Sequence, residues 1–331
     1  MEAVYAEAVS VLRLHFVNVG DGDCILVEQF CGPRIFRMLV DTGLEEAGQQ
    51  GPACMSCVEY LRRHAVRHLD VLFITHLHFD HFGGLRALLR EVRVDEAYSS
   101  YFPEMSARAP RRGVMQGKSV TGLLDALTRW QQDVEAMRAL GCRLHTATGG
   151  MVLQPTDTLR IELPECGEPL RILHRQIWQR LFCGQDVPPE LLYWSSKARN
   201  PASLRLRLCY ADRRVELGAD CYGSVWQVGK ESACDILKVP HHGDGKALTP
   251  ALAHRLHPLH GVISCAAAYI PRKDRPSNTT AALLAEQGTH IWFTDAFSAQ
   301  WHPPVHWPAA VFTVLADGSI LEPATERKTG G

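Results

Sequence analysis

The sequence lacks the features of a secreted or membrane-spanning protein. Its start, MEAVYAEAVSVLRLHF, has no basic stretch followed by an apolar segment and a cleavage site. The longest apolar run, GVISCAAAYI, is far too short to cross a bilayer. The formal net charge of the 331 residues is only −1, so the overall charge does not indicate a nucleic-acid or membrane surface. We therefore expect a cytoplasmic protein without membrane contacts.

Cysteine pairs and serine-hydrolase signals are also scarce. The eleven cysteines are scattered, and Cys54 and Cys57 form a CxxC pair that no second pair at zinc-finger spacing accompanies. We interpret this pair as two small helix residues and expect free thiols in a reducing compartment. No GxSxG motif is present, so the sequence gives no sign of a serine nucleophile.

The composition that is present is ordinary for a globular protein, with 46% hydrophobic and 21% charged residues. Alternating and buried-type apolar segments predict strands at 11–19, 24–30, 35–41, 69–76, 92–100, 151–155, 158–164, 203–210, 215–220, 236–243, 261–266 and 290–295. Helical patterns predict helices at about 54–65, 83–91, 120–139 and 277–287. This alternation of strands and helices indicates the α/β class.

Three parts of the chain are distinguished by this pattern. Residues 1–300 contain the strands and helices of one domain. Residues 165–199 interrupt consecutive strands and include a short helix, RILHRQIWQRLF, so we expect an insertion there. Residues 301–331 are expected to form a C-terminal extension and a solvated tail.

The segment 74–84, ITHLHFDHFGG, places three histidines and one aspartate within six positions. His76 and His78 are separated by one residue after a predicted strand, so their side chains point the same way and can hold one ion. Asp80 and His81 are adjacent at the approach to a helix and can reach a second ion. Imidazole and carboxylate ligands suit zinc, iron or manganese. The segment therefore predicts a metal site.

Later strand ends offer the remaining ligands for two ions. Asp220 ends VELGAD and can bridge two ions through its two carboxylate oxygens. His241 and His242 end ILKVPHH. Packing gives little reason for a buried-type strand to end in such residues, so we expect folding to bring them to the same edge as the histidine cluster.

With these motifs the sequence resembles the metallo-β-lactamase superfamily. More narrowly, it resembles the hydrolase domain of ComEC-type competence proteins and their stand-alone relatives. The segments that carry this resemblance are VNVGDGDCILV (17–27), LVDTG (39–43), ITHLHFDHFGGL (74–85), NPASLRLRL (200–208), LGAD (217–220), LKVPHHG (237–243) and ISCAAAYIPRKDRPSNTTAALLAEQGTHIWFTD (263–295). The resemblance implies an αββα sandwich, two mixed sheets flanked by helices, with metals at one edge.

The resemblance also implies roles for individual residues. It implies that His76 and His78 bind the first ion, that Asp80, His81 and His242 bind the second, and that Asp220 bridges the two ions. The catalytic set is Asp80, Asp220 and His241, in which His241 contacts the substrate or orients a ligand. Asp23 and Asp41 are expected to support the ligands through hydrogen bonds.

The sequence departs from the family pattern in several places. The superfamily generally supplies another histidine for the first ion, but only His145 and His174 fall in the relevant interval, and we expect neither to be a ligand. Asp244 follows the PHHG motif where the family usually has serine. Arg275 stands where the family has the histidine of His-Pro-Ser, and Ala219 precedes the bridging aspartate in place of glycine. These differences indicate altered substrate handling.

The expected activity is that of a metal-dependent hydrolase. Two divalent ions, zinc or manganese, can supply hydroxide near neutral pH and polarise the electrophile, so no protein nucleophile is needed. The resemblance favours a phosphodiesterase or nuclease, with DNA and RNA as candidate substrates. Arg272, Lys273 and Arg275 are candidate phosphate contacts in a loop near the metal edge. A solvated charged loop is an equally open interpretation of these three residues.

Two other functions stay open. The same metals could hydrolyse a carboxylic ester, lactone or thioester, with the 165–199 insertion covering the site and selecting a small substrate. Alternatively, the domain could be a non-catalytic metal-binding module that senses a ligand or partner. The complete set of predicted ligands favours an enzyme. The resemblance also makes partner proteins of a multi-component system an expectation.

Overall fold

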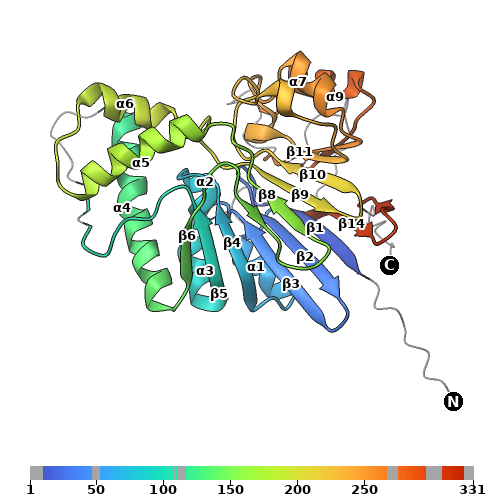
Figure 1. The fold of residues 1–331 in the computed structure, drawn as a ribbon, viewed down its shortest axis with the longest axis horizontal. Helices are drawn as coiled ribbons and strands as arrows, with labels where there is room; N and C mark the ends of the chain where they lie inside the picture. The colour runs from blue at the N-terminus through green and yellow to red at the C-terminus, as the bar shows by residue number, and fades with distance from the viewer. Residues whose placement is uncertain are drawn as a thin grey trace.

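The computed structural model describes residues 10–46, 53–107, 109–110, 117–266, 275–295 and 308–323. Within these ranges two β-sheets pack face to face, and helices cover both outer faces (Figure 1). The four-layer arrangement confirms the αββα sandwich that the resemblance implied. No helix in the described ranges combines the length and the apolar character needed to cross a membrane.

The first sheet has eight strands among the described residues, in the order β15-β14-β1-β2-β3-β4-β5-β6. Neighbours from β15 to β3 pair antiparallel, and those from β3 to β6 pair parallel. The strands are β1 (Val11–Val17), β2 (Ile25–Cys31), β3 (Arg34–Val40), β4 (His68–Ile74), β5 (Arg93–Ser99), β6 (Arg143–Thr146), β14 (Ala309–Leu315) and β15 (Ile320–Leu321).

The second sheet has seven described strands, in the order β13-β12-β11-β10-β9-β8-β7. Neighbours from β10 to β13 pair parallel, so the strands β10, β11, β12 and β13 all end at one edge. The strands are β7 (Val152–Leu153), β8 (Arg160–Glu162), β9 (Leu206–Tyr210), β10 (Arg213–Leu217), β11 (Ile236–Lys238), β12 (His260–Ile263) and β13 (His290–Phe293).

The helices form three groups (Figure 1). The outer face of the first sheet carries α1 (Cys57–Arg63), α2 (Phe79–Phe82), α3 (Leu85–Glu91) and α4 (Lys118–Ala139). The second sheet is covered by α7 (Pro250–Leu256) and α9 (Asn278–Glu286). The segment predicted as an insertion forms α5 (Glu168–Phe182) and α6 (Pro189–Lys197), which pack beside α4. Two short 3₁₀ helices, η2 (Val228–Lys230) and η3 (Pro240–Gly243), lie in the connections.

The core between the sheets follows from strand alternation. In β1, Leu12, Leu14 and Phe16 are every second residue, and all three are fully buried in the cluster shared with the second sheet. Leu206 and Leu208 of β9 belong to the same cluster. Period-two hydrophobic residues on facing strands therefore hold the two sheets together.

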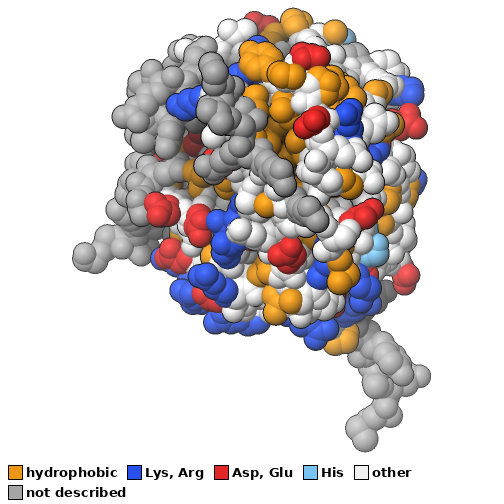
Figure 2. Space-filling model, turned by 90° about the vertical axis from the view of Figure 1, so that its left-hand side faces the viewer, with side chains coloured by type: hydrophobic (Ala, Val, Ile, Leu, Met, Phe, Trp, Pro, Cys, Tyr) orange, Lys and Arg blue, Asp and Glu red, His pale blue; other side chains and the backbone are white. Residues whose placement is uncertain are grey.

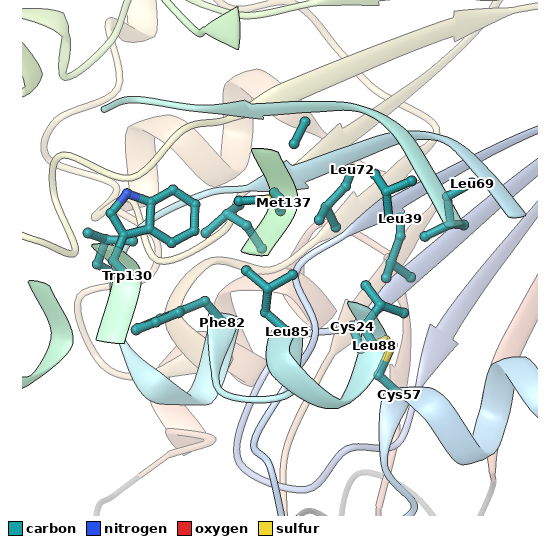
Figure 3. Packing of buried hydrophobic residues seen from close by; sticks show 14 of the residues in the cluster. Cys24, Leu39, Cys57, Leu69, Leu72, Phe82, Leu85, Leu88, Trp130 and Met137 are labelled. Carbon is teal, nitrogen blue, oxygen red and sulfur yellow. The ribbon is translucent and has the colours of Figure 1, made fainter. Parts of the chain in front are cut away.

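A second core anchors the histidine segment to the outer layer. Figure 3 shows Phe82 of α2 and Leu85 of α3 directed into the same packed cluster as Trp130 and Met137 of α4. The Phe82 and Trp130 rings meet edge to face, with centroids 6.0 Å apart. The Trp130 Nε1–H group donates a hydrogen bond of 2.9 Å to the Tyr101 carbonyl oxygen. The short helix that follows the histidines is thus fixed by aromatic packing.

The face that carries α4, α5 and α6 is mixed in character. Figure 2 shows Lys and Arg side chains gathered along its lower rim, with Asp and Glu side chains among them, and hydrophobic side chains higher up. Ile172 of α5 and Tyr193 of α6 are exposed. The visible described surface therefore has no extended patch of a single charge, in keeping with the small net charge.

The C-terminal region differs from the prediction. Residues 301–331 were expected to lie outside the domain, but β14 pairs along its whole length with β1, and β15 pairs with β14. Phe312 and Val314 are buried in the core between the sheets. The expectation of an extension is therefore wrong for residues 309–321. The reason is that β1 needs an antiparallel partner on its open side, and this partner comes from a distant part of the chain.

Two backbone segments approach each other closely at Gly84. The Gly84 N–H group donates to the Gly43 carbonyl oxygen over 3.0 Å. A Cβ atom at Gly84 would lie 2.5 Å from the Thr42 carbonyl oxygen, a distance at which backbone would have to move. The glycine is thus needed where the histidine segment meets the loop after β3.

We predict that Gly84→Ala lowers the free energy of unfolding by about 1–3 kcal/mol, because overpacking forces backbone shifts. Gly122→Ala is the matched control, since Gly122 lies inside α4 with nothing within 4 Å of an added Cβ. The control should raise the free energy of unfolding by about 0.5–1 kcal/mol. Urea unfolding curves measure both changes, and a Gly84→Ala variant as stable as the wild type would contradict the prediction.

Candidate metal centre

The ends of strands from both sheets converge at one edge of the sandwich. His76 and His78 follow β4 of the first sheet, and Asp220 follows β10 of the second. His241 and His242 lie in η3, directly after β11. Two clusters of donor atoms result, each within 4.8 Å: His76, His78 and Asp220 in one, and Asp80, His81 and His242 in the other. Folding thus brings together all six residues that were predicted as ligands.

The Asp220 carboxylate lies between the two clusters. Its Oδ1 is 3.2 Å from His81 Nε2 and 3.6 Å from His242 Nε2. Its Oδ2 is 3.6 Å from His76 Nε2. One oxygen therefore faces each cluster, which is the arrangement that a bridging carboxylate requires.

The residues present fit a bound metal. Both carboxylate oxygens of Asp220, Nε2 of His81 and Nε2 of His242 are buried without a hydrogen bond of acceptable geometry. Unsatisfied buried polar atoms are costly, and native proteins have few of them. A cation would satisfy these atoms together. Imidazole nitrogens and carboxylate oxygens are the donor set of zinc, iron and manganese sites.

The electrostatics of the cluster also suit metal binding. Burial lowers the pKa of His76 well below its ordinary value and lowers the pKa of His78 to about 3. Both imidazoles are therefore neutral, the form that coordinates a metal. Burial also pulls the pKa of His81 down, but Asp220 and Asp41 outweigh it and raise this pKa well above its ordinary value. A metal cation between these carboxylates would compete with that proton.

Asp41 occupies the position expected of a supporting residue. Its Oδ2 lies 2.7 Å from His81 Nδ1 and accepts a hydrogen bond of 2.7 Å from the Thr75 hydroxyl. Its Oδ1 accepts a hydrogen bond of 2.8 Å from the Thr75 N–H group. The carboxylate therefore ties the imidazole of His81 to the end of β4 and directs its Nε2 toward Asp220.

Asp23 is held by a residue that the sequence interpretation overlooked. Lys238 of β11 is completely buried, and its ammonium group pairs with Asp23 Oδ2. The other oxygen of Asp23 is 3.8 Å from His242 Nδ1. A lysine within the otherwise apolar ILKV stretch was the available signal, because a buried lysine needs a partner.

His241 is placed by three polar neighbours. Its Nε2 accepts a hydrogen bond of 2.8 Å from the Asn200 side-chain amide and lies 3.2 Å from Arg275 Nη1. Its Nδ1 lies 2.5 Å from Asp244 Oδ2. The aspartate that replaces the usual serine after PHHG therefore orients this histidine, whose Nε2 is 3.8 Å from Asp220 Oδ2.

The backbone around the centre adopts rare conformations. Asp41, Ala219, His241 and His242 have φ values of 59°, 45°, 47° and 54°, in the left-handed region. Such positions cost about 1–3 kcal/mol each and persist only where the surrounding structure enforces them. Their concentration next to the two clusters is typical of a functional site.

Two arginines flank the clusters. Arg275 Nη2 lies 2.7 Å from Asp21 Oδ2 and 4.0 Å from Asp80 Oδ2. Arg199 donates a hydrogen bond of 2.7 Å to the Leu77 carbonyl oxygen and forms no ion pair with a described carboxylate. Burial lowers the pKa of Arg199 to about 10, so it is still charged at neutral pH. Arg272 and Lys273, the other predicted phosphate contacts, lie outside the described residues.

The two histidines that were expected not to be ligands lie in other contacts. His145 stacks on Tyr98, with ring centroids 4.7 Å apart. His174 stacks on Trp178, with centroids 4.8 Å apart. Neither belongs to a donor cluster among the described residues.

The chain is similar to one known protein family over part of its length and to several solved structures at low identity. The sequence profile of the metallo-beta-lactamase superfamily matches residues 17–157. A search of curated proteins found no match. Solved structures with a similar arrangement include a diphosphatase of the PhnP family, at 12% identity and a TM-score of 0.45, covering 92% of this chain and 98% of that one. Another is the metallo-beta-lactamase fold protein YhfI from Bacillus subtilis, at 11% identity and a TM-score of 0.41, covering 77% of this chain and 86% of that one.

A third such structure is Zn²⁺-bound PqqB from Methylobacterium extorquens, at 10% identity and a TM-score of 0.38, covering 78% of this chain and 80% of that one. Identities this low say nothing about the substrate. The profile match includes the HxHxDH motif, and the two-sheet topology agrees with it. Residues 17–157 therefore carry a metallo-β-lactamase superfamily sequence, and the chain has the metallo-β-lactamase fold.

Proposed function

We propose that this protein is a metal-dependent hydrolase of phosphodiesters, with DNA and RNA as candidate substrates. The observation that carries the proposal is the position of Asp220 between two histidine-rich clusters, with Arg199 and Arg275 beside them. The clusters support a hydrolase, and the arginines favour an anionic substrate. The ComEC-type resemblance of the sequence points to the same substrate class.

The residues of the candidate metal centre have distinct roles in this proposal. His76 and His78 would hold one divalent ion, Asp80, His81 and His242 would hold the other, and Asp220 would be a ligand to both. Zinc or manganese in these positions would supply hydroxide at neutral pH and stabilise negative charge on the reacting oxygens. His241, oriented by Asp244, can accept or return a proton at Nε2 beside the bridging carboxylate.

The charges around the clusters favour a phosphodiester over a neutral ester. A phosphodiester is an anion before and during hydrolysis, so it gains from fixed positive charge throughout. Arg199 is close enough to lower the pKa of His78 and to interact with Asp80. Arg275 lies close to both His241 and Asp80. A neutral ester or lactone has no negative charge when it binds, so these two cations would favour only the oxyanion that develops during its hydrolysis.

We predict that Asp220→Asn abolishes tight binding of metal ions at the candidate metal centre, because a charged ligand shared by both ions is lost. The same substitution should lower kcat/KM by at least about 100-fold. Hydrolysis of bis(4-nitrophenyl) phosphate and of single- and double-stranded DNA with Mn²⁺ or Zn²⁺ measures activity, and metal analysis measures occupancy. Asp157→Asn, at an exposed position in the β7–β8 loop, is the control and should match the wild type. A folded, metal-loaded wild type that cleaves none of these substrates would refute the proposal.

We also predict that Arg275→Gln lowers kcat/KM for the phosphodiester by roughly 10- to 100-fold, the loss expected for one hydrogen bond to a charged group. Hydrolysis of neutral 4-nitrophenyl acetate should fall by a smaller factor, and Arg275→Lys should recover part of the phosphodiester activity. An equal loss on both substrates would instead mean that Arg275 acts only by holding Asp21 and His241. A wild type that prefers the neutral ester would favour the ester-hydrolase alternative.

A further inference from the structure

A separate group of donor residues lies at the other end of the second sheet. His260 begins β12 and His290 begins β13, and the two are directly paired in the parallel ladder. Glu322 follows β15, the edge strand of the first sheet. Two neighbouring strand starts and a chain segment from the opposite sheet therefore meet at one place.

The three side chains offer a compact set of donor atoms. Glu322 Oε1 is 3.3 Å from His290 Nδ1 and 3.7 Å from His260 Nδ1. One donor atom from each residue lies within 4.8 Å of the others. Zinc ligands at about 2.0–2.1 Å in tetrahedral geometry are roughly 3.3 Å apart. Small side-chain adjustments would therefore bring all three atoms to coordination distance.

The imidazole of His260 is buried and held in one orientation. Its side chain is only 10% exposed, and its Nδ1 is buried without a hydrogen-bond partner. The ring packs against Phe312, with centroids 5.3 Å apart, so its orientation is fixed. Leaving a buried imidazole nitrogen without a hydrogen bond costs free energy. A bound group between His260 Nδ1, the Glu322 carboxylate and the His290 imidazole would remove this cost.

We propose that His260, His290 and Glu322 form a second, peripheral site for a divalent transition metal of the Zn²⁺ class, with water as the remaining ligand. Two imidazoles and one carboxylate favour such ions over Mg²⁺ and Ca²⁺, which prefer oxygen ligands. The ion joins the segment after β15 to the starts of β12 and β13. It thereby links the edge of the first sheet to the second sheet.

This site is independent of the candidate metal centre. The centre lies at the carboxyl ends of β10 and β11, where Asp220 and His242 follow. His260 and His290 lie at the opposite, amino ends of the parallel strands β12 and β13. The peripheral site therefore does not depend on the proposed hydrolase activity.

Zinc stoichiometry of the full-length chain tests this proposal. The metal-free protein is equilibrated with micromolar free Zn²⁺, and bound zinc is measured for the wild type, His290→Ala and Glu322→Gln. His290→Ala is expected to bind one equivalent less than the wild type, and Glu322→Gln to bind the same equivalent more weakly. The His290 side chain is 69% exposed, so its removal should leave the fold intact. His254→Ala, an exposed histidine of α7, is the matched control and should bind as the wild type does.

Two further measurements separate the sites. The double variant Asp220→Asn with His290→Ala should lose zinc by the sum of the two single losses, because the sites lie apart. A zinc anomalous signal at coordination distance from His260 Nδ1 in crystals of the wild type would support the proposal directly. Equal zinc stoichiometry for the wild type, His290→Ala and His254→Ala, or anomalous signal confined to the Asp220 centre, would overturn it and leave a metal-free histidine–carboxylate pair.

Discussion

The buried Asp220 carboxylate is the constraint on which the rest of the site depends. It lies between imidazoles that come from both sheets, and neither of its oxygens has a hydrogen-bond partner of acceptable geometry. A buried charge without hydrogen bonds is stable only if opposite charge surrounds it. The ends of β4, β10 and β11 must therefore meet at a fixed spacing, and the sandwich packing of the two sheets provides that spacing.

The surrounding structure fixes the positions of the candidate ligands. The loop after β3 and the histidine segment are joined through backbone hydrogen bonds and the close approach at Gly84. Phe82 and Trp130 fix the other side of the segment, and Asp41 fixes His81. The residues with positive φ next to the clusters are in conformations that cost free energy, which the surrounding structure must offset. Such preorganisation is what a site that binds metals and stabilises developing charge requires.

The two groups of donor residues differ in the charges around them. At the carboxyl ends of the parallel strands, Arg199 and Arg275 lie beside the carboxylates and imidazoles of the centre. At the amino ends, His260 and His290 meet Glu322 without such cations among their described contacts. The two arginines at the first end are the basis of the phosphodiester proposal. The second end is suited to an ion that connects two parts of the fold.

The sequence by itself determined the local features of this protein. The strands and helices follow from side-chain periodicity over a few positions, and the clustered histidines and the residues at strand ends indicate a metal site. The sandwich and the division of the ligands between two ions were implied by the family resemblance that these motifs carry. Only the tertiary structure decided which distant groups meet. The Lys238–Asp23 pair, the orientation of His241 by Asp244, the place of Arg199 and the pairing of β14 with β1 all join residues through space. Local periodicity shows which face of an element is buried, but it does not show which partner that face will contact.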